Sequence, residues 1–297
     1  MTDKSTIVSV DLDDLTCYHA IHGLAAPAAD AAGLVLERCL PRFLELFAAT
    51  GARATFFVIG RDLQRDAESG GKGSALLRQA LAAGHELANH SFAHAYDMVT
   101  WTPAAVYEDL RRCDVLLRGL GARPAGFRAP GYTHDAAMLQ QVAALGYRYD
   151  SSLLPSPAYY AAKLAALGWM AVRGRRSQSL AQGWRSFVGP TRPHFMAECG
   201  LWEVPVSVSP VLRLPMVGTF VLGGHALLLR EAVTRRYLHL ELHGIDLADA
   251  SEVAEADPGL AKLQPELRTP LATRLERLRG LLTARQGASS IGGAFAS

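Results

Sequence analysis

The sequence lacks several features that mark common classes of protein. No uninterrupted apolar run approaches the ~18 residues that a membrane-spanning helix needs. The N-terminus, MTDKSTIVSVDLDD, also lacks the apolar segment and cleavage site of a signal peptide. The 30 basic and 28 acidic residues nearly balance, which leaves no global positive charge for binding nucleic acid. The sequence therefore predicts a cytoplasmic protein with no membrane span and no nucleic-acid partner.

Cysteine is scarce, and two common enzyme signatures are missing. The four cysteines are dispersed and include no C-x-x-C pair: Cys17, Cys39, Cys113 and Cys199. This spacing favours reduced structural thiols over a disulfide framework or a zinc ribbon. No G-x-S-x-G elbow occurs, and the glycine-rich stretch 70–74 lacks the spacing of a phosphate loop. These absences argue against a serine hydrolase and against a nucleotide-phosphate site.

What the sequence does contain is globular composition and a regular alternation of strand-like and helical patterns. Hydrophobic residues make up 49% and charged residues 20% of the 297 positions, which suits one large α/β domain or two ordinary ones. We expect strands at Ile7–Val10, Ala54–Ile59, Glu86–Asn89, Gly126–Arg128, Tyr147–Asp150, Leu201–Val206 and Tyr237–His243. We expect helices at Ala31–Ala49, Ser74–Ala83, Thr102–Leu120 and Pro270–Gln286. This alternation predicts a mostly parallel sheet, either closed or open.

Two segments depart from the alternation. Residues 155–200 contain scattered Gly, Pro and Arg, and we interpret them as a long loop or lid over a site. The last residues, 287–297 (GASSIGGAFAS), are predicted to be frayed. We expect a single catalytic domain over 1–297.

Acidic residues follow the first expected strand. In Asp11-Leu12-Asp13-Asp14, strand alternation places Asp11 and Asp13 on one face. The carboxyl ends of parallel strands are where sites assemble in such folds. Because neighbouring carboxylates repel, they need a cation or a shared proton. Taken alone, the motif also fits a solvated acidic turn or a helix N-cap.

Two pairs of histidines are spaced four residues apart. His90 and His94 can bind one ion if their segment is helical, because positions i and i+4 share a face. His239 and His243 lie in an alternating run, and four residues of strand cover about 13 Å, too far to share an ion. We therefore predict His90 and His94 as the chelating pair, His243 as an acid or base, and His239 as a structural residue deeper in the barrel.

An arginine motif follows the fourth expected strand. In the stretch 126–132 (GFRAPGY), Arg128 precedes Pro130 and Gly131 in a tight turn. An arginine held in this way can bind a carboxylate with two hydrogen bonds. The same text is also typical of an ordinary turn.

The order and spacing of these motifs resemble the polysaccharide deacetylases with NodB homology, carbohydrate esterase family 4. After the carboxylates, the histidine pair and R-x-P-G come the stretches 149–152 (YDSS) and 201–205 (LWEVP) and a late strand that ends in His243. The likeness runs from Ile7 to Asp246. It implies an α/β fold that is a distorted (β/α)7 barrel of mostly parallel strands. It also implies a metal-dependent hydrolase that removes an N-acyl group, with acetyl expected, from an amino sugar or a sugar-containing small molecule.

The resemblance also implies roles for individual residues. It implies that Asp11 is the general base, that Arg128 orients this base and that His243 is the general acid. It implies that the metal ligands are Asp13, His90 and His94. The ion is expected to be Zn²⁺, although Co²⁺, Ni²⁺ or Fe²⁺ fit the same ligands. It would lower the pKa of a bound water towards about 7. A backbone N–H near Tyr132 would help to stabilise the oxyanion.

The opening motif departs from the family's usual adjacent aspartates followed by Gly-Pro. The text D-L-D-D-L-T is similar to a D-x-D branch with atypical cytoplasmic members, and it leaves Asp14 as an alternative ligand to Asp13. The departure favours a small-molecule or lipid-linked amino-sugar substrate over a polymer, and it leaves a homo-oligomer open. Alternatives are a cyclic-amide hydrolase or deformylase, and a non-catalytic metal- or glycan-binding barrel. His19 and Trp202 are further candidates to line the substrate pocket.

Overall fold

The computed structural model describes residues 4–25, 27, 33–174, 176–178, 187–224 and 226–295. Three sequence expectations fall partly outside these ranges. They are the first two residues of the helix expected over Ala31–Ala49, positions 175 and 179–186 of the expected lid, and the last two residues of the tail.

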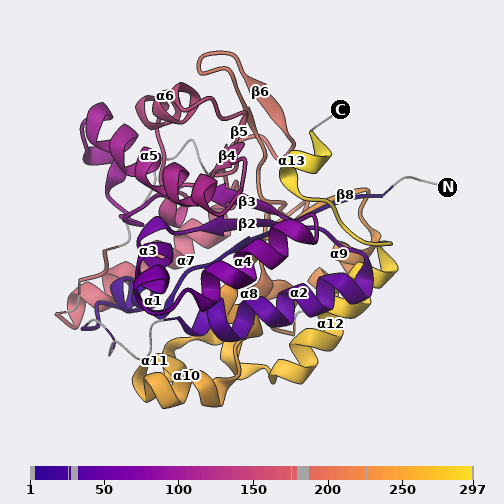
Figure 1. The fold of residues 1–297 in the computed structure, drawn as a ribbon. Helices are drawn as coiled ribbons and strands as arrows, with labels where there is room; N and C mark the ends of the chain where they lie inside the picture. The colour runs from indigo at the N-terminus through magenta and orange to yellow at the C-terminus, as the bar shows by residue number, and fades with distance from the viewer. Residues whose placement is uncertain are drawn as a thin grey trace.

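An eight-stranded sheet forms the centre of the molecule (Figure 1). In spatial order its strands are β6 (His194–Met196), β7 (Leu201–Glu203), β5 (Tyr149–Asp150), β4 (Gly126–Phe127), β3 (Glu86–Asn89), β2 (Thr55–Val58), β1 (Ser5–Asp11) and β8 (Tyr237–His243). All neighbouring strands run parallel except β6, which pairs antiparallel with β7. The seven parallel strands confirm the predicted mostly parallel α/β sheet.

The barrel is distorted between β7 and β8. Along the described chain these two strands do not pair with each other, and the irregular segment 204–217 lies beside β8 instead. There the N–H of Ser207 donates to the carbonyl of His239 at 3.1 Å. The N–H of Glu241 donates to the carbonyl of Met216, also at 3.1 Å. An irregular chain segment thus covers this edge of β8, and the curled sheet is the distorted (β/α) barrel that was predicted.

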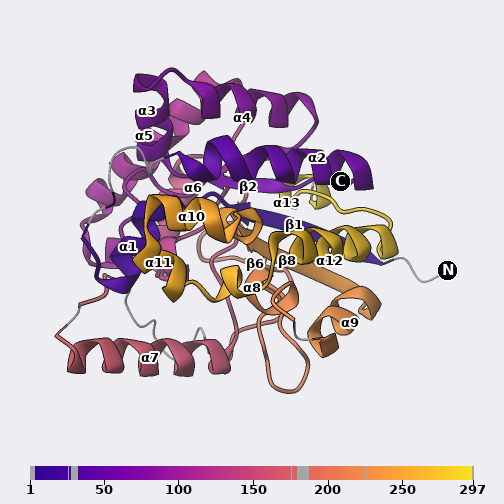
Figure 2. The same ribbon diagram turned by 90° about the horizontal axis from the view of Figure 1, so that it is seen from below.

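Helices follow most strands and cover the outside of the sheet (Figures 1 and 2). The α-helices are α1 (Leu15–His22), α2 (Leu40–Thr50), α3 (Gly60–Glu68), α4 (Lys72–Ala82), α5 (Pro103–Gly119), α6 (Ala136–Ala144), α7 (Pro157–Val172), α8 (Gly218–Val221), α9 (Ala226–Thr234), α10 (Ala250–Ala256), α11 (Pro258–Leu263), α12 (Leu271–Ala284) and α13 (Ile291–Ala294). A π-helical turn, η2 (Val35–Cys39), precedes α2, and 3₁₀ turns lie at η3 (Met98–Thr100), η4 (Pro130–Tyr132), η6 (Gly244–Leu247) and η7 (Pro265–Arg268).

Helix α5 forms as the sequence predicts. The side chain of Thr102 accepts a hydrogen bond from the N–H of Ala105 at 3.3 Å, and Pro103 occupies the first helical position. Thr102 therefore satisfies one of the N–H groups that have no partner at the start of a helix. Proline is tolerated at the first helical position because the N–H that it lacks would have no partner within the helix.

The register between β1 and β8 decides which side chains enter the barrel. Ser9 pairs with Glu241, and Asp11 pairs with His243. Because paired residues on parallel strands point to the same face, these four side chains line the interior together. The residues between them, such as Leu242, point outward. The alternation of polar and apolar residues along β8 thus separates a polar barrel interior from an apolar outer face.

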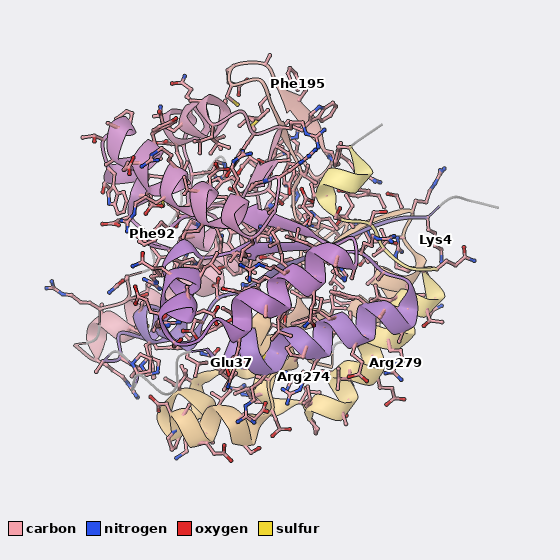
Figure 3. The ribbon with its side chains drawn as sticks, in the orientation of Figure 1. Lys4, Glu37, Phe92, Phe195, Arg274 and Arg279 are labelled. Atoms are coloured by element: carbon pink, nitrogen blue, oxygen red, sulfur yellow. The ribbon has the colours of Figure 1, made fainter. Side chains whose placement is uncertain are left out.

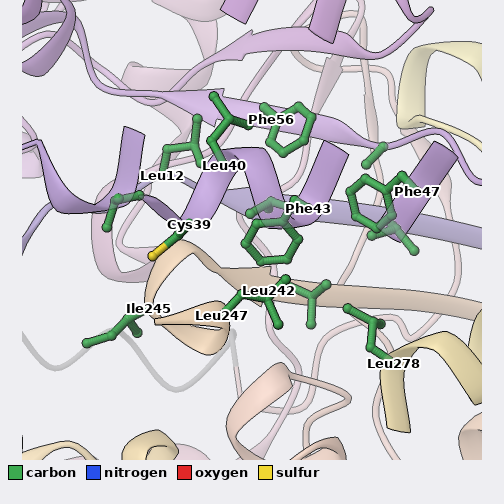
Figure 4. Close-up of a cluster of buried hydrophobic side chains, with 14 of the residues drawn as sticks. Leu12, Cys39, Leu40, Phe43, Phe47, Phe56, Leu242, Ile245, Leu247 and Leu278 are labelled. Atoms are coloured by element: carbon green, nitrogen blue, oxygen red, sulfur yellow. The ribbon is translucent and has the colours of Figure 1, made fainter. Parts of the chain in front are cut away.

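The main hydrophobic core lies between this outer face and the helices (Figure 4). Phe43 and Phe47 of α2 pack over Phe56 of β2, with the Phe43 and Phe47 ring centroids 5.7 Å apart. Leu242 of β8 and Leu278 of α12 complete the same cluster. Each such side chain is buried, and full burial of one contributes about 1.5–3 kcal/mol. This core holds β1, β2 and β8 in register and so fixes the residues at their carboxyl ends.

The tail expected to be frayed is packed over residues 287–295, so that prediction is wrong for this stretch. Ser289 forms a bridge with Ile7 of β1, and the N–H of Gly292 donates to Glu86 Oε2 at 2.8 Å. Ile291 is fully buried in a small apolar cluster that includes Ile7 and Tyr149. Ile291, with Phe295 packed against the same cluster, thus anchors the tail against the end of the barrel opposite Asp11.

The segment 155–200 contains regular structure and is not a continuous loop. Helix α7 and strand β6 both lie within it. Within the described ranges, no helix combines the length and apolarity needed to cross a bilayer.

Candidate active site

The three predicted metal ligands meet at the carboxyl end of the sheet. Asp13 follows β1, and His90 follows β3. Asp13 Oδ1 lies 3.2 Å from Nε2 of His90 and 3.3 Å from Nε2 of His94. All three side chains are buried. The structure thus brings these residues together from two distant stretches of sequence.

The two histidines converge through a turn, and the expectation of a helical segment is wrong. Ser91 and His94 adopt left-handed backbone conformations, with φ of 63° and 49°. The N–H of Ser91 donates to Asn89 Oδ1, and the N–H of His94 donates to Ser91 Oγ, both at 2.8 Å. Left-handed residues reverse the chain within a few positions, so the imidazoles face each other with ring centroids 4.7 Å apart.

Helix α5 holds this turn from outside. The carboxylate of Asp109 accepts the N–H of Phe92 at 2.8 Å and that of Ala93 at 2.9 Å. Sequence reasoning missed Asp109. Its signal was an acidic residue among the apolar residues on the inner face of the helix, which also buries Asp114.

The donor set fits a divalent cation. Across the part of the chain that is described, Asp13 Oδ1 and both ring nitrogens of His94 are buried and have no hydrogen-bond partner. His90 Nδ1 lies 2.8 Å from the carbonyl oxygen of Arg128, which orients Nε2 towards Asp13. Two imidazoles and one carboxylate are a ligand set that zinc accepts, with coordination positions left open.

The ionisation of Asp13 and His94 suits metal binding, whereas at His90 burial acts to lower the pKa but the carboxylates of Asp11 and Asp13 raise it. Burial alone would raise the pKa of Asp13, but the imidazoles of His94 and His90 more than offset it and hold the pKa well below its usual range. Burial lowers the pKa of His94. A carboxylate and a neutral imidazole are the forms that ligate a metal.

Asp14 is directed away from this cluster. Its Oδ1 accepts the N–H of Leu15 at 2.7 Å, and its Oδ2 lies 2.5 Å from Arg65 Nη2. Asp14 caps α1 and forms an ion pair, so the geometry favours Asp13 over Asp14 as the ligand.

Arg128 contacts the predicted base, as expected. Its Nη1 donates to Asp11 Oδ1 at 2.5 Å, and its Nη2 donates to Ser9 Oγ at 3.0 Å. Its Nε donates to the carbonyl of Ser151 at 2.8 Å. The guanidinium is fully buried. It therefore fixes the carboxylate of Asp11, whose Oδ2 lies 3.7 Å from His90 Nε2.

The YDSS motif supports the turn that carries Arg128. Ser152 Oγ donates to Asp150 Oδ1 at 2.6 Å and accepts the N–H of Ala129 at 2.8 Å. In the LWEVP motif, Glu203 Oε1 accepts the N–H of Leu153 at 3.1 Å. These buried carboxyl groups order the loop after β5 next to the arginine.

Sequence reasoning missed a fully buried glutamate in the same site. Glu241 Oε1 accepts the hydroxyl of Tyr132 at 2.7 Å and lies 3.5 Å from Arg128 Nη1. Burial raises the pKa of Glu241 to about 7, although the nearby Arg128 acts to lower it. The alternation of polar and apolar residues along β8 predicts this position, because Glu241 lies between His239 and His243 on the same face.

His243 lies at the end of β8 beside this glutamate. Its Nε2 is 3.9 Å from Glu241 Oε1, and its side chain is 24% exposed. Burial acts to lower the pKa of His243, but the carboxylates of Glu241 and Asp11 raise it to about 9. A protonated, partly exposed imidazole is suited to donate a proton.

The acid role expected for His243 predicts a pH dependence. Because its pKa is raised to about 9, the imidazole carries a proton at neutral pH and loses it as the pH rises through 9. We expect turnover to fall on the alkaline side, and His243→Asn to lower kcat by about 10²–10⁴-fold. A pH profile of kcat for both proteins measures this. An unchanged alkaline limb in His243→Asn would assign that limb to another group.

His239 is the structural residue that was predicted. It is fully buried, with Nε2 3.0 Å from Ser9 Oγ and Nδ1 3.0 Å from the carbonyl oxygen of Pro205. Burial, helped by Arg128, lowers its pKa to about 3. His239 is therefore neutral and serves the packing of the barrel interior.

The backbone N–H of Tyr132 takes part in a turn. It donates to the carbonyl of Ala129 at 3.0 Å within the turn η4. In this conformation the N–H of Tyr132 itself is engaged, so the oxyanion donor expected near Tyr132 would have to be a neighbouring backbone N–H.

The two predicted pocket residues lie at different places. His19 lines a cavity of about 380 Å³ together with His94, Tyr96 and Arg61, directly beside the metal-ligand cluster. Trp202 lines a separate cavity of about 270 Å³ next to α13. His19 thus stays a candidate, whereas the prediction for Trp202 is wrong because its side chain points to the opposite end of the sheet.

Comparison with known proteins agrees with this geometry. The family model described as polysaccharide deacetylase matches residues 30–149. This match includes His90, His94 and Arg128, whereas Asp11, Asp13 and His243 lie outside it.

Two curated relatives carry deacetylase names. The chain is 30% identical over 108 residues to an Arthroderma benhamiae protein named as a peptidoglycan-N-acetylglucosamine deacetylase, which covers 36% of this chain and 24% of that protein. It is 33% identical over 94 residues to a chitooligosaccharide deacetylase of Bradyrhizobium, which covers 31% of this chain and 39% of that protein. The chain thus matches less than half the length of either relative.

Solved structures share the fold. A Mycobacterium smegmatis protein assigned to the polysaccharide deacetylases aligns over 99% of this chain and 90% of its own, with a TM-score of 0.60 and 18% identity. A Bacillus anthracis pseudoenzyme of carbohydrate esterase family 4 aligns over 97% of this chain and 64% of its own, with a TM-score of 0.50 and 11% identity. Over residues 30–149 the sequence is thus similar to the polysaccharide deacetylases, and the whole chain shares the fold of solved structures assigned to that group.

Proposed function

We propose that this chain is a metal-dependent N-deacetylase that removes an acetyl group from an amino sugar or a sugar-containing small molecule. The observation that carries the proposal is the approach of Asp13, His90 and His94 to one point, beside an Asp11 fixed by a buried arginine. The three ligands are proposed as Asp13, His90 and His94, and the ion as Zn²⁺.

Each residue has a role that its position supports. A divalent cation at the ligand cluster would polarise the acyl carbonyl and lower the pKa of water in the site. Asp11, held by Arg128, is placed to accept the proton of the attacking water. His243 is placed to protonate the departing amine, because amide cleavage needs an acid for the leaving nitrogen. The same Asp11 carboxylate lies close to both His90 and the arginine, so it is oriented before substrate binds.

The substrate class follows from the cavity and from the relatives. The cavity beside His94 measures about 380 Å³, which is of the size that small-molecule sites show. The relatives' names, which refer to N-acetylglucosamine and chitooligosaccharide, support an acetylated amino sugar. We propose a small or lipid-linked amino sugar as the substrate.

The setting of the enzyme is proposed as well. A single catalytic domain over 1–297 in the cytoplasm fits the described cysteines, all of which are unpaired. Cell fractionation tests the location, and limited proteolysis tests the domain boundary.

The decisive experiment assays metal-replete protein against N-acetylated sugars, N-formylated sugars and cyclic amides, with acetate, formate and ring-opened product measured separately. We expect acetate, and we expect Asp11→Asn to keep its metal while turnover falls about 10²–10⁴-fold. Formate or ring-opened product would support the alternative hydrolases. No product from any substrate would support the non-catalytic binding barrel.

A further inference from the structure

Helix α7 (Pro157–Val172) turns an apolar face to solvent. From Ala161 to the end of the helix, every exposed residue is Ala, Gly, Leu, Trp or Val. Three of the largest exposed apolar side chains of the described chain lie here: Leu164 at 46%, Trp169 at 56% and Val172 at 88%. A surface helix normally presents charged and polar residues to water, so α7 shows the reverse pattern.

The side of α7 that packs against the protein carries both polar and apolar residues, including Lys163 and Met170. Tyr159 forms an edge-to-face contact with Tyr132 at a centroid distance of 5.7 Å, and Tyr160 is buried. Lys163 Nζ donates to the carbonyl of Gly131 at 3.4 Å. The helix is therefore anchored by its polar residues beside the turn of Tyr132, and its apolar face stays outside.

The surrounding sequence carries charge of one sign. Between Asp150 and Glu198 there is no acidic residue, although the whole chain has 28. The same stretch contains six basic residues: Lys163, Arg173, Arg175, Arg176, Arg185 and Arg192. Arg173 lies at the end of α7, with its guanidinium 3.8 Å from the centre of the Trp169 ring. Exposed apolar residues thus lie on α7, and a run of basic residues begins at its C-terminal end.

The position of α7 leaves this face accessible. Figure 2 shows the helix at the edge of the molecule, set apart from the other helices. With 16 residues it is too short to span a bilayer, which needs about 20. Such a helix can lie in the plane of a membrane surface, with its apolar face among the acyl chains and its cations at the headgroups.

We propose that the exposed face of α7, together with Arg173 and Arg176, docks the protein onto an anionic lipid surface. Tryptophan is enriched at the membrane interface, and each basic residue near an anionic leaflet adds attraction. A second copy of the chain fits less well. A symmetric pairing of α7 helices would bring the two sets of arginines together without acidic partners.

Not every exposed apolar residue belongs to this surface. Phe195 on β6 is 54% exposed, but it lies at a distant edge of the sheet (Figure 3). Val211 is 88% exposed in the segment before α8. Val211 therefore provides a matched control, because it is as exposed as Val172 and lies outside α7.

The test is flotation of the full chain with vesicles of phosphatidylcholine, with and without phosphatidylglycerol. We expect binding to the anionic vesicles that weakens as salt rises. The double variant Trp169→Asp, Val172→Asp should lower the partition coefficient about tenfold or more, while Val211→Asp leaves it unchanged. Arg173→Gln with Arg176→Gln should weaken binding only where phosphatidylglycerol is present. Circular dichroism checks that each variant is folded.

Three results would overturn the proposal. The wild-type chain could fail to float, it could bind neutral and anionic vesicles equally, or the α7 variant could bind as the wild type does. A dimer that light scattering detects and that Val172→Asp dissociates, without vesicle binding, would assign the face to self-association instead. The assay uses no substrate, so its outcome is independent of the proposed deacetylation.

Discussion

Asp13→Asn is expected to abolish metal retention and to lower turnover by at least about a thousandfold. The oxygen Asp13 Oδ1 lies within 3.3 Å of both His90 Nε2 and His94 Nε2. An amide there supplies no charge to hold a cation between two imidazoles. Because a catalytic cation contributes several kcal/mol of transition-state stabilisation and about 1.4 kcal/mol corresponds to a factor of ten, its loss accounts for this effect. Metal content after dialysis and kcat/KM for acetate release measure the two consequences.

Asp14→Asn is the matched control for this prediction. It makes the same chemical change one residue along the chain, at a carboxylate that bonds Leu15 and Arg65 instead of the histidines. Asparagine caps helices as well as aspartate does, so we expect metal retained and the loss of an ion pair worth at most about 1 kcal/mol. If Asp14→Asn lost the metal while Asp13→Asn kept it, the ligand assignment would be reversed.

The sequence predicts the regular elements of the fold well because their signals are local. Strand β8 has the predicted bounds, Tyr237–His243, since alternation along one strand separates its two faces. Helix α5 begins at the predicted cap. The packed tail was missed because only two large apolar residues, Ile291 and Phe295, anchor it, and periodicity cannot detect such isolated contacts.

The site is only partly predictable, because its contacts join distant stretches. Asp11 and Arg128 are separated by 117 positions, and no local pattern links them, so the resemblance to a family supplied that pairing. The histidine turn was expected to be helical, because the spacing alone does not reveal the left-handed Ser91 and His94. Glu241 was overlooked although alternation places it in the barrel interior between two histidines. The local pattern therefore predicts which residues face the barrel interior. The contacts among those residues could be identified only from the fold.

Arg128→Met is expected to destabilise the protein by about 3–5 kcal/mol, the cost of leaving a buried charge without its partner. The guanidinium is fully buried and contacts Asp11 at 2.5 Å and Glu241 at 3.5 Å. Without it, the carboxyl of Glu241 favours its neutral form, so its pKa rises above the value of about 7 that it has beside the arginine. The unfolded chain ionises this carboxyl more readily, so the destabilisation should be largest above pH 7 and smaller at pH 5. Urea unfolding at the two pH values measures it.

Arg111→Met provides the comparison, since Arg111 and its partner Glu108 are both about half exposed on the surface of α5. Such a pair contributes little to the free energy of unfolding, so the effect of its loss should be small at either pH.

Adding Asp11→Asn to Arg128→Met removes one of the unpaired carboxylates. This double variant should recover part of the lost free energy of unfolding, while turnover stays abolished because the base is gone. Recovery of stability would show that the cost of Arg128→Met comes from the carboxylate that it leaves unpaired. If stability did not recover, the cost of Arg128→Met would come from lost hydrogen bonds to Ser9 and Ser151.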